Sequence, residues 1–549
     1  MGNWFKSGTP WIWLNAAAVS ASLIAVAGLL GLIAARGLGH FWPANIAEID
    51  YRKDGQTIRL IGEIRDHEDV LRERLVSAGL TVPEDVLTVR RYQIKNGNRD
   101  VTGLDFAWIL GPDIQAQRYP DDLVVIERRE WGNFYGYLRE VREAGKTVAS
   151  GAAAWAVMHE RLQRANGLFA QIRDIERGEL GSINYELEQL RLETRRLELK
   201  HQTTPEALAE IAARRAELQA QYAELQKSLN GLYSDIRRDS IAVETQAGQL
   251  VELPMSKVVH ALRPNAMGVG AKLRVYLFNV WEFLSDEPRE ANTEGGIFPA
   301  IFGTVLMVLL MSMLVTPFGV IAAVYLREYA KQGPLTRLVR IAVNNLAGVP
   351  AIVYGVFGLG FFVYFLGGNI DRLFYPEAQP APTFGTPGLL WASLTLAILT
   401  VPVVIVATEE GLARIPKAIR EGSLALGATK AETLWRTVLP MASPAMMTGL
   451  ILAVARAAGE VAPLMLVGVV KLAPTLPLDG NAPFLHLDRK FMHLGFHIYD
   501  VGFQSPNVEA ARPLVYATAL LLVLVTVLLN LAAIAIRNRL REKYRALDH

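Results

Sequence analysis

Hydrophobic residues along the chain are concentrated in six long runs. The first, Trp11 to Ala35, contains more than twenty residues without a charge, which is enough to cross a hydrocarbon core of about 30 Å. Five further runs lie in the second half of the chain: Ile297 to Leu326, Ile341 to Leu366, Leu389 to Ala407, Met441 to Val470 and Pro513 to Ile536. This pattern predicts six membrane helices and hence an α-helical membrane protein.

The first run also has features of a secretory signal peptide, which is cleaved from the mature protein. A signal peptide has a shorter apolar segment, whereas Trp11, Trp13 and Trp42 suit anchors at the membrane interfaces. The sequence therefore favours an uncleaved membrane anchor over residues 1–39.

Residues 40–293 form a polar block in which the pattern changes to that of an α+β domain. Short alternating runs flank Asp54–Gly55 and Asn96–Gly97, dipeptides that are typical of two-residue hairpin turns. We expect a β-hairpin at each of them, and Asp66 is expected to cap a short helix in between. At the end of the block, Val269 to Leu284 predicts an amphipathic helix that leads back to the membrane.

Within this block, residues 155–238 are rich in Glu, Arg, Leu and Gln, with apolar residues at helical spacing. In the second half these residues alternate in steps of three and four, the pattern of a coiled-coil seam. The seam comprises Leu208, Ile211, Leu218, Tyr222, Leu225, Leu229, Leu232 and Ile236, with Arg215 at the one position that is not apolar. Thr204 and Pro205 mark the start of a new helix after a polar turn. The stretch therefore predicts a long antiparallel coiled-coil hairpin between domain segments 40–154 and 239–293.

Basic residues in the membrane part lie in alternate loops. They are Arg327, Lys331, Arg337 and Arg340 in one loop, Arg414, Lys417, Arg420, Lys430 and Arg436 in another, and Arg537, Arg539, Arg541, Lys543 and Arg545 in the tail, residues 537–549. Loops rich in Lys and Arg stay on the cytoplasmic side. We therefore expect a multi-pass membrane protein, with these loops in the cytoplasm and residues 40–293 on the opposite side of the membrane.

Composition and motifs narrow the function classes further. The net charge of +2 gives no indication of nucleic-acid binding, and the absence of cysteine excludes disulfides and thiolate metal sites. His486, His493 and His497 with Asp488 share no compact ligand spacing, so no metal site is predicted. The chain has no Gly-x4-Gly-Lys-Ser/Thr motif and no visible Ser-His-Asp motif, so it should neither bind ATP nor act as a hydrolase.

The loop 408–440 between the fourth and fifth runs contains a short helix, a turn at Gly427 and a second helix. Its residues Glu421-Gly422-Ser423, x3, Gly427, x9, Thr437, x, Leu439-Pro440 resemble the cytoplasmic loop signature of bacterial ABC importer permeases, Glu-Ala-Ala, x3, Gly, x9, Ile, x, Leu-Pro. The spacing is complete, although Gly, Ser and Thr replace the two Ala and the Ile. The resemblance implies that Glu421, Gly422, Ser423, Gly427, Leu439 and Pro440 couple the chain to an ATPase. The alternative is an ordinary amphipathic hairpin between two membrane helices.

Two charged residues, Arg456 and Glu460, lie in the fifth run, four positions apart and therefore on one face of a helix. At about 1.5 Å per residue, Arg456 lies roughly 20 Å along the helix from Ser443, close to mid-membrane. Charges at that depth usually line a pathway. The alternative is a structural pair whose two charges neutralise each other.

The segment around this pair, Ala455 to Leu464, resembles the Ala-Arg-x-Ala-Gly-Glu-x-Ala-Pro-Leu segment of the PstA family of phosphate transporter permeases. The partner PstC family usually has Leu-Gly-Glu-Thr-Met there. Glu294 to Ile297 and Gly319 to Tyr329 are also similar to the PstA family. The resemblance therefore extends from Glu294 onward and does not cover residues 40–290.

What the resemblance implies is a type I ABC importer permease core over residues 294–536, with Arg456 and Glu460 on the substrate pathway. It implies import of inorganic phosphate across the bacterial inner membrane from a periplasmic binding protein, together with a second, PstC-like permease and a dimer of PstB-like ATPases that bind the ATP. The chain itself would then be a transport subunit without a cofactor, not an enzyme. Two alternatives stay open: a permease for another oxyanion such as sulfate or molybdate, and a membrane-anchored coiled-coil scaffold or sensor with a permease-like body.

Overall fold

The computed structural model describes residues 7–53, 55–77, 79, 86–289, 292–505 and 508–544. The chain folds into two compact units, one made of residues 1–40 with 297–549 and the other of residues 41–296. Residues 545–549, including Arg545 of the basic tail, and Asp54 of the first predicted turn lie outside the described residues.

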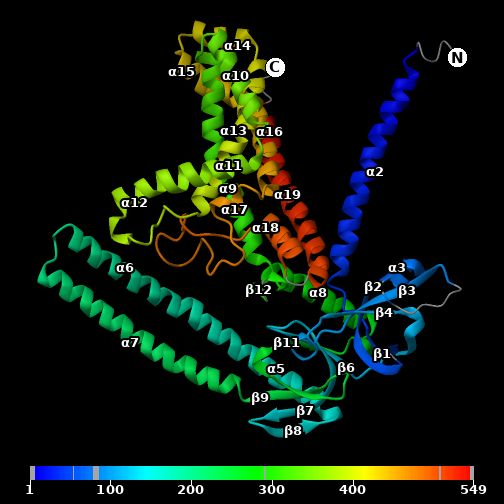
Figure 1. The fold of residues 1–549 in the computed structure, drawn as a ribbon. Helices are drawn as coiled ribbons and strands as arrows, with labels where there is room; N and C mark the ends of the chain where they lie inside the picture. Colours follow the sequence, from blue (N-terminus) through cyan, green and yellow to red (C-terminus); the bar gives the residue numbers. More distant parts are fainter. Residues whose placement is uncertain are drawn as a thin grey trace. The chain divides into compact units, whose positions relative to one another are not determined.

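The described part of the first unit contains six helices that are long and apolar enough to cross a membrane, as the hydrophobic runs predict (Figure 1). They are α2 (Thr9–Gly39), α9 (Phe298–Val324) with a π-helical turn at Tyr325–Tyr329, α11 (Ala351–Phe357) continuing through residues 358–367 into α12 (Gly368–Phe374), α13 (Leu389–Arg414), α16 (Leu439–Gly459) and α19 (Val508–Tyr544).

Two of the predicted spans differ from the observed helices because prolines interrupt them. The run Ile341 to Leu366 is divided between a separate helix, α10 (Pro334–Leu346), and the spanning helix that begins after Pro350. Residues before a proline avoid helical geometry, which separates the two helices. The run Met441 to Val470 is helical only to Gly459, because Pro463 has no N–H to donate to the Gly459 carbonyl.

The core of this unit is built around α13, whose side chains are buried along most of its length. It packs against α16 at two glycines where the backbones come very close. A Cβ atom added at Gly449 would lie 2.6 Å from Ala407 Cβ, and one added at Gly411 would lie 2.4 Å from Ala445 Cβ. Small residues at such crossings let membrane helices pack closely.

The second unit contains two larger antiparallel sheets (Figure 1) and a two-stranded one, in which β12 (Pro288–Arg289) pairs with β13 (Glu294–Gly295). One has the strand order β4-β3-β2-β1-β5, and the other has β10-β9-β7-β6-β11 with β8 paired to β7. The strands are β1 (Ile46–Lys53), β2 (Gln56–Leu71), β3 (Thr88–Lys95), β4 (Phe106–Leu110), β5 (Ile114–Arg118), β6 (Leu123–Arg128), β7 (Phe134–Glu143), β8 (Lys146–Ser150), β9 (Asp239–Glu244), β10 (Leu250–Pro254) and β11 (Val258–Leu262).

The first predicted hairpin is confirmed, since β1 pairs with β2 across a turn in which Gly55 has a φ of 79°. The second is a hairpin with a longer loop than predicted. Strands β3 and β4 pair, but residues 96–105 connect them and contain a short helix, α4 (Arg99–Thr102). The loop is held away from a tight turn because Asn98 exchanges hydrogen bonds of 2.8 and 2.9 Å with the Tyr135 backbone.

The prediction that Asp66 caps a helix is wrong. Asp66 lies inside β2, opposite Gln93 of β3, and the helix α3 (Arg72–Ser77) begins only after that strand ends. Pairing with β3 supplies backbone hydrogen bonds along the whole run, and this non-local interaction outweighs the local capping preference.

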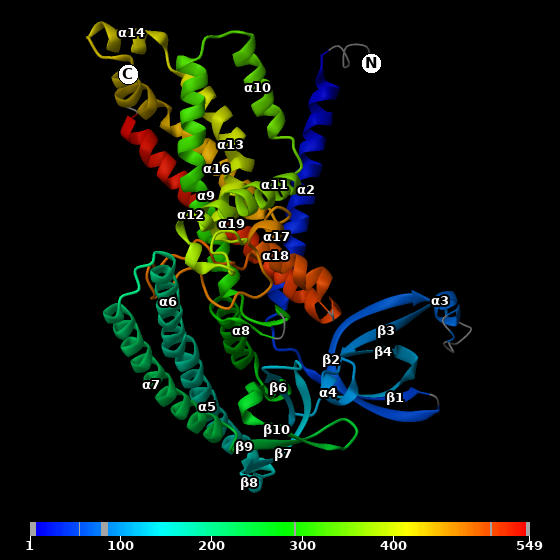
Figure 2. The same ribbon diagram turned by 60° about the vertical axis from the view of Figure 1, so that its left-hand side comes forward.

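The helical hairpin has one arm formed by α5 (Ala152–Asp174), a π-helical turn at Ile175–Glu179 and α6 (Leu180–Leu199), and a second arm formed by α7 (Pro205–Ile236). The arms lie side by side in both views (Figures 1 and 2), and an ion pair of 2.7 Å joins Arg214 to Glu186. Thr204 caps α7, as predicted, by accepting a hydrogen bond from the Ala207 N–H.

The base of this hairpin is part of the core of the second unit. Met158 and Leu162 of α5 and Ile236 of α7 are buried in one cluster with Phe134 of β7 and Ile241 of β9. Farther out along α7, Leu218 is still buried, whereas Leu208 is exposed. The lower halves of the two arms therefore stabilise the sheet, and only the outer halves project from it.

Candidate functional site

The loop between α13 and α16 forms two short helices that meet at a glycine turn. They are α14 (Lys417–Ala425) and α15 (Lys430–Thr433), and Gly427 between them has a φ of 88°. This left-handed conformation is readily accessible only to glycine, which explains why the turn forms there. The helix–turn–helix arrangement therefore agrees with what the sequence predicts around Gly427.

Local hydrogen bonds fix the angle between these two helices. The Ser423 hydroxyl lies 2.9 Å from the Thr433 hydroxyl and so connects α14 to the end of α15. Thr429 and Glu432 form a capping box, in which each side chain accepts a hydrogen bond from the other residue's backbone N–H. The loop is consequently a structured element rather than a flexible connection.

A cationic side chain attaches this element to the membrane helices. Arg420 makes an ion pair of 2.9 Å with Glu328 at the end of α9, and it donates hydrogen bonds to the carbonyls of Leu412 and Ile415. Lys430 contacts the Glu328 carbonyl as well. A displacement of the loop would therefore be transmitted to both α9 and α13.

The predicted coupling residues occupy different positions in this element. Glu421 and Gly422 are exposed on α14, and Ser423 is half-buried against Thr433. Leu439 and Pro440 form the first turn of α16, where a proline is well tolerated.

The sequence analysis missed two apolar side chains on the outer face of the same element. Leu426 is 90% exposed and Trp435 is 74% exposed. Large exposed apolar side chains are typical of surfaces that contact another protein or a membrane. The helical periodicity of the loop's apolar residues is the sequence signal that could have identified Leu426 and Trp435.

The pair Arg456 and Glu460 is brought together, but not on one helix as predicted. Arg456 lies in the last turn of α16, whereas Glu460 follows the helix with extended backbone angles. Arg456 Nε lies 3.4 Å from Glu460 Oε1, and both side chains are half-buried. The helix ends here because of Pro463, so Arg456 lies at a helix end rather than in the middle of a longer span. A cation in the last turn also interacts favourably with the helix dipole.

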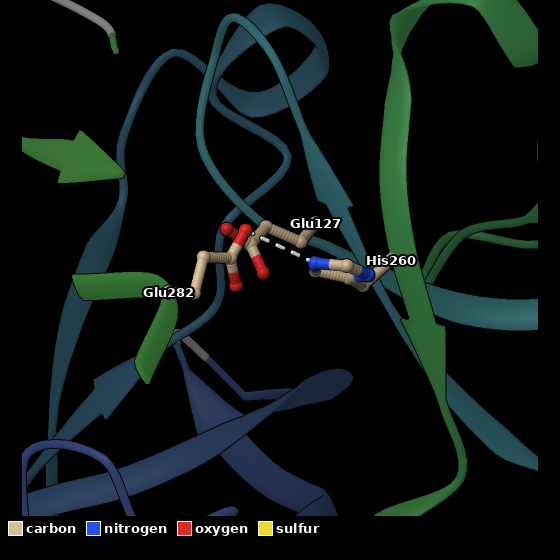
Figure 3. A group of neighbouring side chains, drawn as sticks. All are labelled: Glu127, His260 and Glu282. Atoms are coloured by element: carbon tan, nitrogen blue, oxygen red, sulfur yellow. Dashed lines mark hydrogen bonds and ion pairs between the residues drawn. The ribbon is translucent and has the colours of Figure 1, made fainter. Parts of the chain in front are cut away.

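A second charged cluster, in residues 41–296, was not found from the sequence. Glu127 of β6, His260 of β11 and Glu282 of α8 (Val269–Ser285) each offer a ligand atom, and these atoms lie within 4.8 Å of one another (Figure 3). His260 Nε2 lies 3.1 Å from Glu282 Oε1, while Arg289 contacts the carboxylates of Glu127 and Glu282. The three residues come from distant parts of the chain, so no spacing motif could have indicated them.

The charges in this cluster favour protonated His260. Burial lowers the pKa of His260, but the hydrogen bond to Glu282 and the charge of Glu127 raise it by more, so the pKa lies above its usual value. The positive charge of Arg289 lowers the pKa of His260, but by less than the two glutamates raise it, so the cluster is still suited to hold a proton. A divalent cation would have to compete with the guanidinium for the same oxygens.

Comparisons with known proteins match part of this chain to a protein family and to several transport proteins. Residues 315–545 match the model of the binding-protein-dependent transport system inner membrane component. The chain is similar to the phosphate transport system permease protein PstC of Xylella fastidiosa, at 30% identity over 39% of this chain and 68% of that protein. It is also similar to the phosphate transport system permease protein PstA of Mycobacterium leprae, at 35% identity over 35% of this chain and 58% of that protein.

A third relative carries no substrate in its name. It is the probable ABC transporter permease protein YqgH of Bacillus subtilis, at 30% identity over 36% of this chain and 62% of that protein. The chain thus spans less than two thirds of some of these relatives. The helical membrane part has the type I ABC importer permease fold expected from the sequence, and the chain belongs to the family of binding-protein-dependent transport system inner membrane components.

Proposed function

We propose that this chain is the permease subunit of an ABC importer that carries inorganic phosphate from a periplasmic binding protein into the cytoplasm. The observation that supports the substrate most directly is the similarity to permeases named for phosphate transport. In this proposal the partners are a second, PstC-like permease and a pair of ATPase subunits. ATP is bound by those ATPases and not by this chain.

The loop from residue 408 to 440 is proposed as the surface that contacts the ATPase. Its support is the structured turn at Gly427, the attachment of Arg420 to Glu328, and the outward-facing Leu426 and Trp435. A rigid element of this kind can transmit closure of the ATPase to α9 and α13. Glu421, Gly422, Ser423, Leu439 and Pro440 belong to the same surface or to its connection with α16.

Arg456 is proposed as the cation that the anion meets on its path. A bare anion is expensive to move through a low-dielectric region, and a guanidinium offers bidentate hydrogen bonds to phosphate oxygens. Glu460, at 3.4 Å from Arg456, would hold the guanidinium when the path is empty and weaken its grip on the anion. Release of phosphate then remains possible.

Uptake measurements on purified complexes in proteoliposomes test this role. Arg456→Gln should abolish phosphate uptake while the complex still assembles. Arg456→Lys should be poorly active, because the ammonium is a point charge and lacks the planar, forked donors of the guanidinium. Glu460→Gln should change the turnover rate. Arg372→Gln, at an exposed arginine of α12, is the matched control and should transport normally. Full uptake by Arg456→Gln would overturn the proposal, and recovery of uptake in the double Arg456→Gln, Glu460→Gln variant would indicate a structural pair instead.

The substrate and the sidedness are tested separately. Competition of phosphate uptake by sulfate or molybdate would indicate another oxyanion, and assembly without transport of any anion would favour a membrane-anchored scaffold. The proposed topology places domain segments 40–154, 155–238 and 239–293 in the periplasm, with 155–238 as a coiled-coil hairpin. Reporter fusions after Gly39 and Asp286 should therefore report the periplasm, and fusions near Lys331 and Lys417 the cytoplasm.

A further inference from the structure

Helix α8 is packed with its polar side toward its own domain. Asn279 donates a hydrogen bond of 3.1 Å to the Phe41 carbonyl, and Lys272 contacts Asn45. Glu282 points from α8 toward His260 in the charged cluster (Figure 3). The attached face of α8 thus carries these polar contacts together with the buried side chain of Phe283.

The opposite face of α8 carries a continuous apolar stripe. Its residues recur every four positions, so they lie on one side of the helix. They are Val269, Leu273, Leu277 and Trp281, with Phe278 beside them, and all five are exposed. Leu277 is 60% exposed and Trp281 is 67% exposed, whereas Arg274 is the one exposed charged residue within this helix.

This orientation is the reverse of an ordinary amphipathic helix. A helix on the surface of a soluble domain buries its apolar stripe and exposes its polar face, because burial of apolar area is the main gain in free energy. On α8 the specific hydrogen bonds, the His260 cluster and the buried Phe283 fix an orientation that leaves the stripe uncovered. The stripe is therefore stabilised only if an apolar medium or partner covers it.

The path of the chain identifies the membrane as that medium. Phe41, which packs against Tyr276 and Phe283 of α8, comes two residues after the membrane helix α2 ends at Gly39. At its other end α8 finishes at Ser285, and the membrane helix α9 begins at Phe298. This second connection folds back on itself, because the Gly296 N–H donates a hydrogen bond of 3.1 Å to the Glu287 carbonyl. Both connections therefore hold α8 close to the lipid surface.

Length and composition indicate that α8 lies along the surface rather than across the bilayer. A spanning helix needs about 20 apolar residues, and α8 has 17 residues that make two half-buried polar contacts and one exposed polar contact. Trp281 and the nearby Trp42 are of the type that accumulates at membrane interfaces. An amphipathic helix with these properties binds in the interface plane.

We propose that α8 lies in the lipid interface, with Val269, Leu273, Leu277, Phe278 and Trp281 inserted between the lipid acyl chains. The helix would then fix the second unit to the bilayer surface independently of the spanning helices. This role follows from the reversed packing of α8 and does not depend on which anion the permease transports.

The absence of cysteine in the chain makes a direct test possible. Single variants Leu273→Cys and Leu277→Cys of the full chain, labelled with the fluorophore NBD, are reconstituted alone in lipid nanodiscs that contain doxyl-labelled phosphatidylcholine. Leu250→Cys, at an exposed leucine of β10, is the matched control because it replaces a leucine of similar exposure away from α8. The stripe side chains contact no polar partner, so the substitutions leave the attachment of α8 intact.

We expect a blue-shifted NBD emission and several-fold stronger doxyl quenching at Leu273→Cys and Leu277→Cys than at Leu250→Cys. Equal quenching at all three positions would overturn the proposal. A second measurement adds a PstC-like permease to the nanodiscs. If the emission shifts to the blue only after that addition, without doxyl quenching, a protein rather than lipid covers the stripe and the proposal is wrong.

Discussion

Replacement of Gly427 provides the most direct test of the coupling loop, because the structure separates backbone strain from crowding. Gly427 has a φ of 88°, and a Cβ atom added there would meet no atom within 4 Å. The cost of a side chain at this position is therefore almost entirely the cost of the left-handed conformation. For alanine that cost is about 1 to 2 kcal/mol.

The expected effect grows with the side chain. A cost of about 1 to 2 kcal/mol lowers the population of the native turn about 5- to 30-fold in Gly427→Ala. Valine is β-branched and is a strong outlier at positive φ, so Gly427→Val should lose about 2 to 3 kcal/mol, or about 30- to 150-fold. Gly427→Asn should lose less than either, because asparagine tolerates this region.

The assay compares anion uptake with ATP hydrolysis in proteoliposomes that contain the assembled transporter. We expect Gly427→Val to insert and assemble normally, but to hydrolyse ATP without matched uptake. Gly231→Ala is the control, since Gly231 lies within α7, away from the loop, and an added Cβ atom meets nothing within 4 Å. In a helix this change is neutral or stabilising by about 0.5 to 1 kcal/mol. Normal coupling in Gly427→Val, or an equal defect in Gly231→Ala, would refute the reasoning.

Three further predictions follow from the described contacts. Arg420→Met leaves the carboxylate of Glu328 without its ion-pair partner at 2.9 Å and should destabilise the loop by about 1 to 3 kcal/mol. A double-mutant cycle with Glu328→Gln measures the interaction between the two residues. Strictly additive effects of the two substitutions would contradict the prediction. The attachment of α8 through protonated His260 should be fully present below the ordinary histidine pKa of about 6.5 and should be lost as the pH rises through the raised pKa. The loss would be measured as faster hydrogen exchange in α8. His260→Asn should abolish this pH dependence. Removal of residues 188–220, closed by a short Gly/Ser loop, should leave the fold of residues 41–296 intact, because Met158, Leu162 and Ile236 stay in the core. Removal of residues 155–238 should unfold this unit. Limited proteolysis would distinguish the two outcomes.

The sequence alone determined the features that depend on local chemistry. Six apolar runs became six long apolar helices, since a run of this length has few other stable environments. Thr204 and Pro205 start α7, and glycine forms the turns at Gly55 and Gly427, because these residues act through their own backbone conformations.

Features that depend on distant contacts needed the tertiary structure. Asp66 lies in a strand because β3 pairs with it, and the loop after Asn96 is held open because Asn98 bonds to Tyr135. The end of α16 at Gly459 is an intermediate case, because Pro463 is visible in the sequence but lies within an apolar run that continues past it.

Helix α8 shows the same limit most clearly. Its periodicity predicts an amphipathic helix, yet periodicity does not say which face is attached to the domain. That choice was made by Asn279, Lys272 and Glu282, which bind partners more than twenty residues away in the sequence. A local pattern can define the two faces of a helix, but only the groups that the fold brings opposite to it decide which face is buried.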